Sequence, residues 1–132
     1  HLRYIFNMNN EIPKHVLKDP DGLVTYEYIA NNIESLNADN IQPLLDNLMR
    51  ADTTGQFTAS AARYLYAIDP TGFASAINTL VAATIDRDRE RRYIGTLLQA
   101  IWGDDYQSRI SELNVTDDNF RRIYKRLYSR GI

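Results

Sequence analysis

Apolar residues recur at helical spacing through most of this 132-residue chain. From residue 22 onward they fall at positions i, i+3, i+4 and i+7, which places them on one face of a helix. Gly, Pro, Asn and Asp residues separate these segments and mark where one helix ends and the next begins. The pattern predicts helices at about 22–36, 40–51, 57–68, 70–85, 88–102, 104–113 and 116–130.

The N-terminal segment, residues 1–18, is patterned less clearly. Its LRYIFNM stretch alternates in the manner of a strand, but no other part of the chain shows a strand pattern that could pair with it. Because an isolated strand is not stable, we expect a helix here as well. The chain is therefore predicted to be all-α.

The helix at 70–85 has the clearest start and the most central character. Asp69 can cap it, and Pro70 occupies the favoured first helical position. Its face opposite the apolar stripe carries only small, uncharged residues, which is typical of a helix covered on more than one side. For the other starts, we expect Asn37 or Asn40 to cap the helix at 40–51 and Thr116 to cap the last one.

Short connections make consecutive helices antiparallel neighbours. We therefore predict one domain, residues 1–132, built from six or seven helices, with helix pairs at about 22–51 and 70–102 and further helices at 104–113 and 116–130. Each pair begins with Asp-Pro-x-Gly, at 19–22 and 69–72, fifty positions apart. The spacing is compatible with an internal repeat and equally with one helix-starting turn used twice.

The second predicted pair resembles the HEAT and armadillo class of helical-hairpin repeats. Pro70 at the start of its first helix, Asp86 at the turn and Arg92 six residues later match the HEAT arrangement of Pro, Asp and Arg. The first pair departs from this arrangement, because no arginine follows its turn at the matching place. The resemblance implies a short, right-handed HEAT-like stack; the alternative is an irregular helical bundle.

Composition limits the kinds of function. The chain has no cysteine, which excludes disulfides, thiolate chemistry and cysteine-based zinc sites, and suits a reducing compartment such as the cytoplasm. No apolar run is long enough to span a membrane. The net charge is −2, with 5 Lys/Arg against 9 Asp/Glu in residues 1–85 and 10 against 8 in residues 86–132.

Catalytic signatures are weak. The two histidines, His1 and His15, have no recognisable nucleophile nearby, and no glycine-rich phosphate loop occurs. The carboxylates of Asp86, Asp88 and Glu90 could serve a hydrolase or bind a cation, but helix capping and ion pairing explain acids at such places better. We therefore expect no cofactor and no metal, and we favour a non-enzymatic role.

The last helix is the best candidate for binding. Its sequence, NFRRIYKRLYSRGI, places five cations opposite the apolar stripe with no acid between them. Such a face could contact a phosphate backbone or an acidic protein surface. The five residues are Arg121, Arg122, Lys125, Arg126 and Arg130.

Tyrosine is the second candidate, with nine residues in the chain. Tyr28 and Tyr66 each follow another tyrosine by two positions, so they point away from the buried stripe of their helices. Exposed tyrosines are enriched where proteins meet proteins. A second layer of helices inside the domain would also cover them.

These features favour a protein–protein interaction module, such as an adaptor, a regulatory domain or an inhibitor, with another protein as partner. The first alternative is a helical domain that contacts nucleic acid through the basic face of the last helix. The second is an enzyme whose site is built from acids and tyrosines.

Overall fold

The computed structural model describes residues 12–129, and this range is all-α, without strands. Residues 1–11, where we expect a helix, and Arg130 lie outside it. The helices are α2 (Lys14–Leu17), α3 (Leu23–Asn31), η1 (Ile33–Ser35), α4 (Gln42–Ala51), α5 (Gln56–Ile68), α6 (Ala74–Arg87), α7 (Gly95–Trp102), η2 (Tyr106–Arg109), α8 (Ile110–Thr116) and α9 (Asp118–Tyr128). None of these helices is long and apolar enough to cross a membrane.

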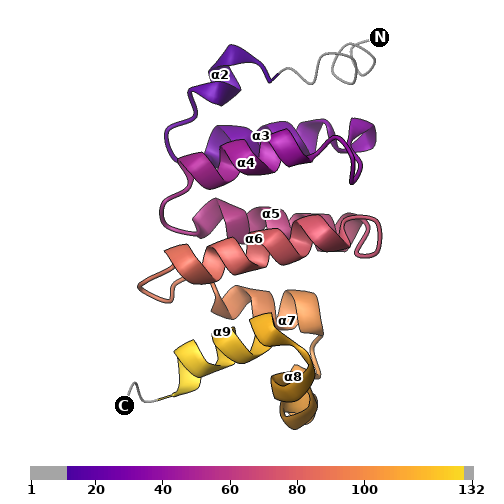
Figure 1. The fold of residues 1–132 in the computed structure, drawn as a ribbon, viewed down its shortest axis with the longest axis vertical. Helices are drawn as coiled ribbons and strands as arrows, with labels where there is room; N and C mark the ends of the chain where they lie inside the picture. Colours follow the sequence, from indigo (N-terminus) through magenta and orange to yellow (C-terminus); the bar gives the residue numbers. More distant parts are fainter. Residues whose placement is uncertain (1–11, 130–132) are drawn as a thin grey trace.

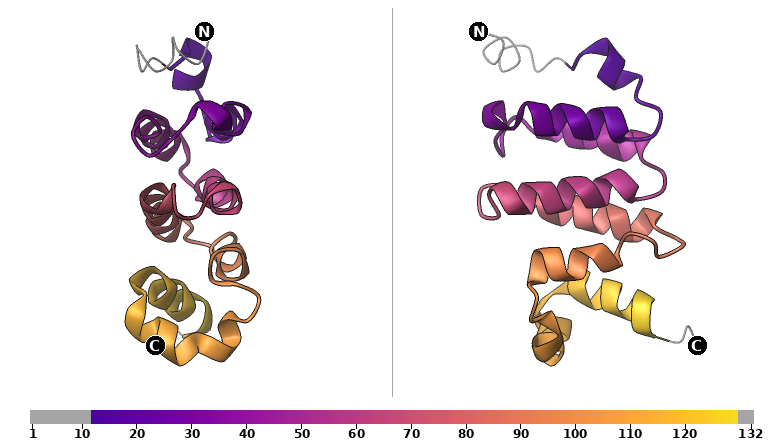
Figure 2. Two further views of the ribbon diagram at one scale, coloured as in Figure 1. Left: turned by 90° about the vertical axis from the view of Figure 1, so that its right-hand side faces the viewer. Right: turned by 180° about the vertical axis from the view of Figure 1, so that it is seen from behind.

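The longer helices form three antiparallel pairs that stack along one axis: α3 with α4, α5 with α6, and α7 with α9 (Figure 1). Seen along the helices, α3, α5 and α7 form one column and α4, α6 and α9 form the other (Figure 2, left). Helix α8 and η2 connect α7 to α9 at the last pair. The all-α prediction with antiparallel pairs is thus confirmed.

Helix α6 is central, as its uncharged face predicts. It packs against α5, α4 and α9 and buries seven residues along its length. The seven are Ala76, Ile77, Leu80, Val81, Ala83, Thr84 and Ile85. On the other helices the core is mainly aliphatic, with Leu44, Leu48, Leu65 and Leu97 fully buried, and α9 adds the fully buried aromatic ring of Phe120.

One predicted pairing is wrong. Helix α6 belongs with α5, whereas the prediction joined it to the helix at 88–102; α7 instead packs against α5 and begins the next pair. Pro70 lies in the α5–α6 turn, Asp86 lies inside α6, and Arg92 precedes α7. These residues therefore hold other positions than the HEAT resemblance assumes, and the resemblance itself stays a prediction.

The structure also differs from the prediction at the N-terminal caps of three helices. Helix α6 begins only at Ala74, and the Asp69 carboxylate accepts the Gly72 N–H within the preceding turn at 2.9 Å. Helix α9 is capped by Asp117, whose carboxylate accepts the Phe120 N–H at 3.1 Å, and not by Thr116. Helix α4 follows Ile41 and has no side-chain cap.

The connections lie at two opposite edges of the stack (Figure 1; Figure 2, right). The loop edge carries the α2–α3, α4–α5 and α6–α7 loops and the C-terminal end of α9. The turn edge carries the connections within each pair. The two Asp-Pro-x-Gly segments are on different edges, since 19–22 precedes α3 and 69–72 joins α5 to α6. Their fifty-residue spacing is therefore not a structural repeat.

A different repeat organises the loop edge. A buried aspartate follows α2, α4 and α6 in turn: Asp19, Asp52 and Asp88. In each loop, Oδ2 accepts the backbone N–H six residues later, at 2.7 Å from Thr25, 2.7 Å from Thr58 and 2.8 Å from Ile94. The carboxylate thus satisfies donors at the start of the next helix that would otherwise be buried without a partner.

The third residue after each of these aspartates has a positive φ angle. The angle is 109° at Gly22, 90° at Gly55 and 59° at Arg91. Glycine adopts this left-handed region without steric cost, which explains its use in the first two loops. The first two loops share the sequence Asp-x-x-Gly-x-x-Thr, whereas the third places an arginine where the others have glycine.

An arginine near the end of the second helix of each pair bonds to the part of the stack before it, which is α2 for the first pair and the preceding pair for the other two. The Arg50 guanidinium donates to the carbonyl of Leu17, at 2.9 Å, and Arg87 donates to that of Met49, at 3.2 Å. Arg126 donates to the carbonyls of Ile85 and Asp88, at 2.8 and 2.7 Å. These bonds satisfy carbonyls at the C-terminal end of the preceding helix, where a cation is also favoured by the helix dipole.

The Asp19 loop makes stability depend on pH. Burial on its own would raise the pKa of Asp19, but hydrogen bonds from the Thr25 hydroxyl and from the N–H groups of Thr25, Gly22 and Asp21 together hold it below its ordinary value. The folded protein therefore favours the charged form. This contribution to stability is present above about pH 4 and is lost as the pH falls through the lowered pKa.

We expect Asp19→Asn to lower the free energy of unfolding by roughly 2 kcal/mol at pH 7, and the deficit to shrink as the pH is lowered towards 2. Urea denaturation at pH 7, 4 and 2.5 measures it. Asp39→Asn is the control, since Asp39 is exposed. A deficit that stays constant across this range would contradict the charged cap.

Candidate binding site at the loop edge

A recess of about 620 Å³ opens between the C-terminal end of α6, the α6–α7 loop and the last turns of α9. We call it the basic recess. Four of its lining residues are cations and one is an acid, so its net side-chain charge is positive. Its lining comprises Ile85, Asp86, Arg91, Arg122, Lys125, Arg126 and Ser129.

The structure brings three of the predicted α9 cations to this recess and separates the fourth. Arg122 forms an ion pair with Asp86 at 2.9 Å, and Arg126 is held by the two α6–α7 carbonyls described above. The Lys125 side chain is exposed and has no hydrogen-bond or ion-pair partner within residues 12–129. Arg121 lies outside the recess and pairs with Asp118. Arg130 lies outside the described residues.

Arg91 joins the recess from the α6–α7 loop, and sequence reasoning did not single it out. Its guanidinium donates to the backbone carbonyl of Arg126 at 3.3 Å. This bond ties the loop to the end of α9 and uses only one of the five N–H donors that an arginine offers. Among residues 12–129, Arg91 is the one non-glycine residue with a positive φ angle.

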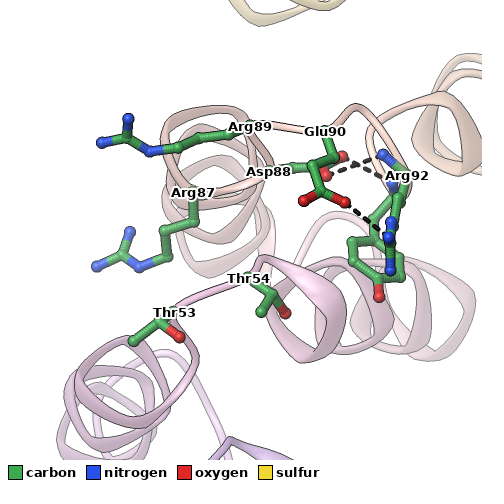
Figure 3. A pocket seen from close by; sticks show the side chains of 8 residues that line it. Thr53, Thr54, Arg87, Asp88, Arg89, Glu90 and Arg92 are labelled. Atoms are coloured by element: carbon green, nitrogen blue, oxygen red, sulfur yellow. Dashed lines mark hydrogen bonds and ion pairs between the residues drawn. The ribbon is translucent and has the colours of Figure 1, made fainter.

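A second, smaller recess of about 260 Å³ lies on the other side of the same loop, facing Thr53 and Thr54. Figure 3 shows Arg87 and Arg89 extending to one side of it, whereas Arg92 lies on the opposite side beside Glu90. Arg92 and Glu90 form an exposed ion pair at 2.7 Å. Like the Lys125 ammonium, the Arg89 guanidinium has no polar partner in the described part of the chain.

The cations at this end of the loop edge are only partly compensated. Arg122 and Arg92 pair with carboxylates, but Arg87, Arg91 and Arg126 bond to backbone carbonyls, which carry no full charge. The C-terminal ends of α6 and α9 add about half a negative charge each. Together they offset about one positive charge. Among residues 12–129, positive side-chain charge is therefore in excess around the recess.

The acids of residues 86–90 are occupied by structural contacts. The Asp88 carboxylate is buried and accepts the N–H groups of Arg92, Tyr93 and Ile94. Asp86 and Glu90 are the ion-pair partners of Arg122 and Arg92. Within residues 12–129, no group of three or more His, Cys, Asp or Glu side chains is placed to hold a metal ion.

Tyr28 and Tyr66 lie away from the basic recess. They occupy the second halves of α3 and α5, which end at the turn edge. Both are half-buried and pack against the hydrophobic core, and burial raises the pKa of Tyr28. The layered helices therefore cover much of both rings, and a binding role for these tyrosines stays a prediction.

No protein-family model, curated protein or solved structure matches this chain.

Proposed function

We propose that this protein is a non-enzymatic protein-binding module, and that its partner presents an acidic segment to the basic recess and the adjoining α6–α7 loop. One observation carries the proposal: cations that have no carboxylate partner among residues 12–129 surround a concave surface that is open to solvent. Complementary charge of this kind speeds association and selects the partner.

The shape of the charged surface favours a protein segment over a nucleic acid. Binding along a phosphate backbone calls for cations spread in a row. Here Arg121 is paired with Asp118 near the start of α9 and Arg122 is paired with Asp86. The cations that have no carboxylate partner among residues 12–129 gather around one recess. A localised cluster suits one or a few acidic groups.

The test is binding of a fluorescein-labelled peptide of ten glutamates, measured by fluorescence anisotropy at low ionic strength. We expect binding that weakens with added salt, and a loss of at least about tenfold in the double variant Arg89→Glu/Lys125→Glu, since the two introduced glutamates repel those of the peptide. Lys14→Glu/Lys18→Glu is the matched control: it changes the charge equally at the opposite end of the stack, and both lysines are exposed.

Equal weakening by both double variants would show a non-specific charge effect and contradict the proposed site. Labelled single- and double-stranded DNA provide the comparison. Binding of DNA without binding of the peptide would replace the proposal with the nucleic-acid alternative.

A further inference from the structure

The α6–α7 loop contains an arginine in a backbone conformation that the equivalent loops give to glycine. Arg91 has a φ angle of 59°, where Gly22 and Gly55 have 109° and 90°. A residue with a Cβ atom costs about 1 kcal/mol more than glycine in this region. The helix cap does not need the arginine, because Asp88 provides it through three backbone N–H groups.

The Arg91 side chain is placed for contact with a ligand. It lines the basic recess beside Arg122 and Lys125. Its bond to the Arg126 carbonyl, at 3.3 Å, fixes its direction and leaves the other donors available. An arginine held in place in this way loses less conformational freedom on binding than a free surface side chain.

The composition of the recess suits a dianion. A phosphomonoester carries about −1.5 to −2 charges at pH 7 and three strong acceptor oxygens, which the planar guanidinium binds through two parallel hydrogen bonds. Arg91 and Lys125 offer two charges that no carboxylate of the described residues pairs with, and Arg122 adds a third that is shared with Asp86. A single carboxylate would balance only one of them.

We propose that the basic recess binds a phosphomonoester on a segment of the partner protein, and that Arg91 contacts the phosphate. This inference rests on the proposed function, since the phosphate is carried by the acidic segment. It adds that phosphorylation of that segment strengthens the complex.

The experiment uses three labelled peptides that are identical except at the central residue, which is serine, glutamate or phosphoserine, flanked on each side by two glutamates. We expect the phosphoserine peptide to bind at least about tenfold more tightly than the glutamate peptide, the effect of one or two additional charge-assisted hydrogen bonds. Arg91→Gly should abolish this advantage, and it should also weaken the binding of all three peptides because it removes one positive charge from the recess.

The same variant separates binding from folding. Because glycine suits the positive φ angle, Arg91→Gly should leave the urea midpoint of unfolding unchanged or raise it. Arg121→Ala is the control: it removes one charge from α9 outside the recess and should keep the phosphoserine advantage.

Equal affinities for the phosphoserine and glutamate peptides would overturn the inference and leave the proposed function standing. An advantage that survives in Arg91→Gly would overturn the assignment of Arg91. Binding of none of the three peptides would overturn the proposed function together with the inference.

Discussion

Replacing Asp52 with alanine is expected to lower the free energy of unfolding by roughly 3 kcal/mol. Asp52 is fully buried between the first two helix pairs. Its carboxylate accepts the N–H groups of Thr54, Gly55, Phe57 and Thr58 and the Thr54 hydroxyl. Alanine removes the acceptor and leaves these donors without a partner at the start of α5, which is more costly than losing an exposed cap.

Urea denaturation followed by circular dichroism measures this loss. Asp69→Ala is the matched control, because Asp69 accepts one backbone N–H in an exposed turn and its loss should cost about 0.5 kcal/mol. Similar losses in the two variants would mean that the buried aspartates do not hold the pairs together.

Replacing Asp88 with alanine is expected to lower both the free energy of unfolding and the affinity for the acidic peptide. The loss of stability should be roughly 2–3 kcal/mol, since three backbone N–H groups at the start of α7 lose their acceptor. The same carboxylate fixes the loop that carries Arg91. We therefore expect affinity for the acidic peptide to fall at least about tenfold.

Asp52→Ala provides the comparison for this second effect, because it makes the same chemical change in an equivalent loop that does not line the basic recess. Peptide binding is measured at a temperature where circular dichroism shows both variants folded. Asp52→Ala should then bind within about twofold of the parent protein. If Asp88→Ala also keeps its affinity, the α6–α7 loop is not part of the site.

The fold class could be predicted because helical periodicity is a local property of the chain, and α6 was identified as central from its uncharged face. Which consecutive helices form a pair could not be predicted. Asp19-x-x-Gly22 and Asp69-x-x-Gly72 look alike in sequence, and Ser75 even follows the second as Thr25 follows the first. Only the stack distinguishes them, because it buries Asp19 and leaves Asp69 exposed.

The loop repeat was present in the sequence. Asp-x-x-Gly-x-x-Thr occurs at 19–25 and again at 52–58, whereas the segment at 69–72 resembles 19–22 more closely because both contain a proline after the aspartate. The third loop, 88–94, keeps only the aspartate, so it could not be recognised without its backbone angles.

The candidate site was predictable in part. Helical spacing placed Arg122, Lys125 and Arg126 on one face of α9, and they do line one recess. Spacing within a helix says nothing about partners from elsewhere in the chain. It therefore could not show that Asp86 neutralises Arg122, that Arg126 bonds to α6 carbonyls, or that Arg91 completes the recess.

The most direct test of binding at the loop edge is a titration of ¹⁵N-labelled protein with the acidic peptide, followed through backbone amide and arginine Nε signals. We expect shifts confined to residues 86–93 and the last turns of α9, including the Arg91 Nε signal, with the Gly22 and Gly55 amides unchanged. Shifts centred on the Tyr28 and Tyr66 ends of α3 and α5, or no shifts at saturating peptide, would contradict it.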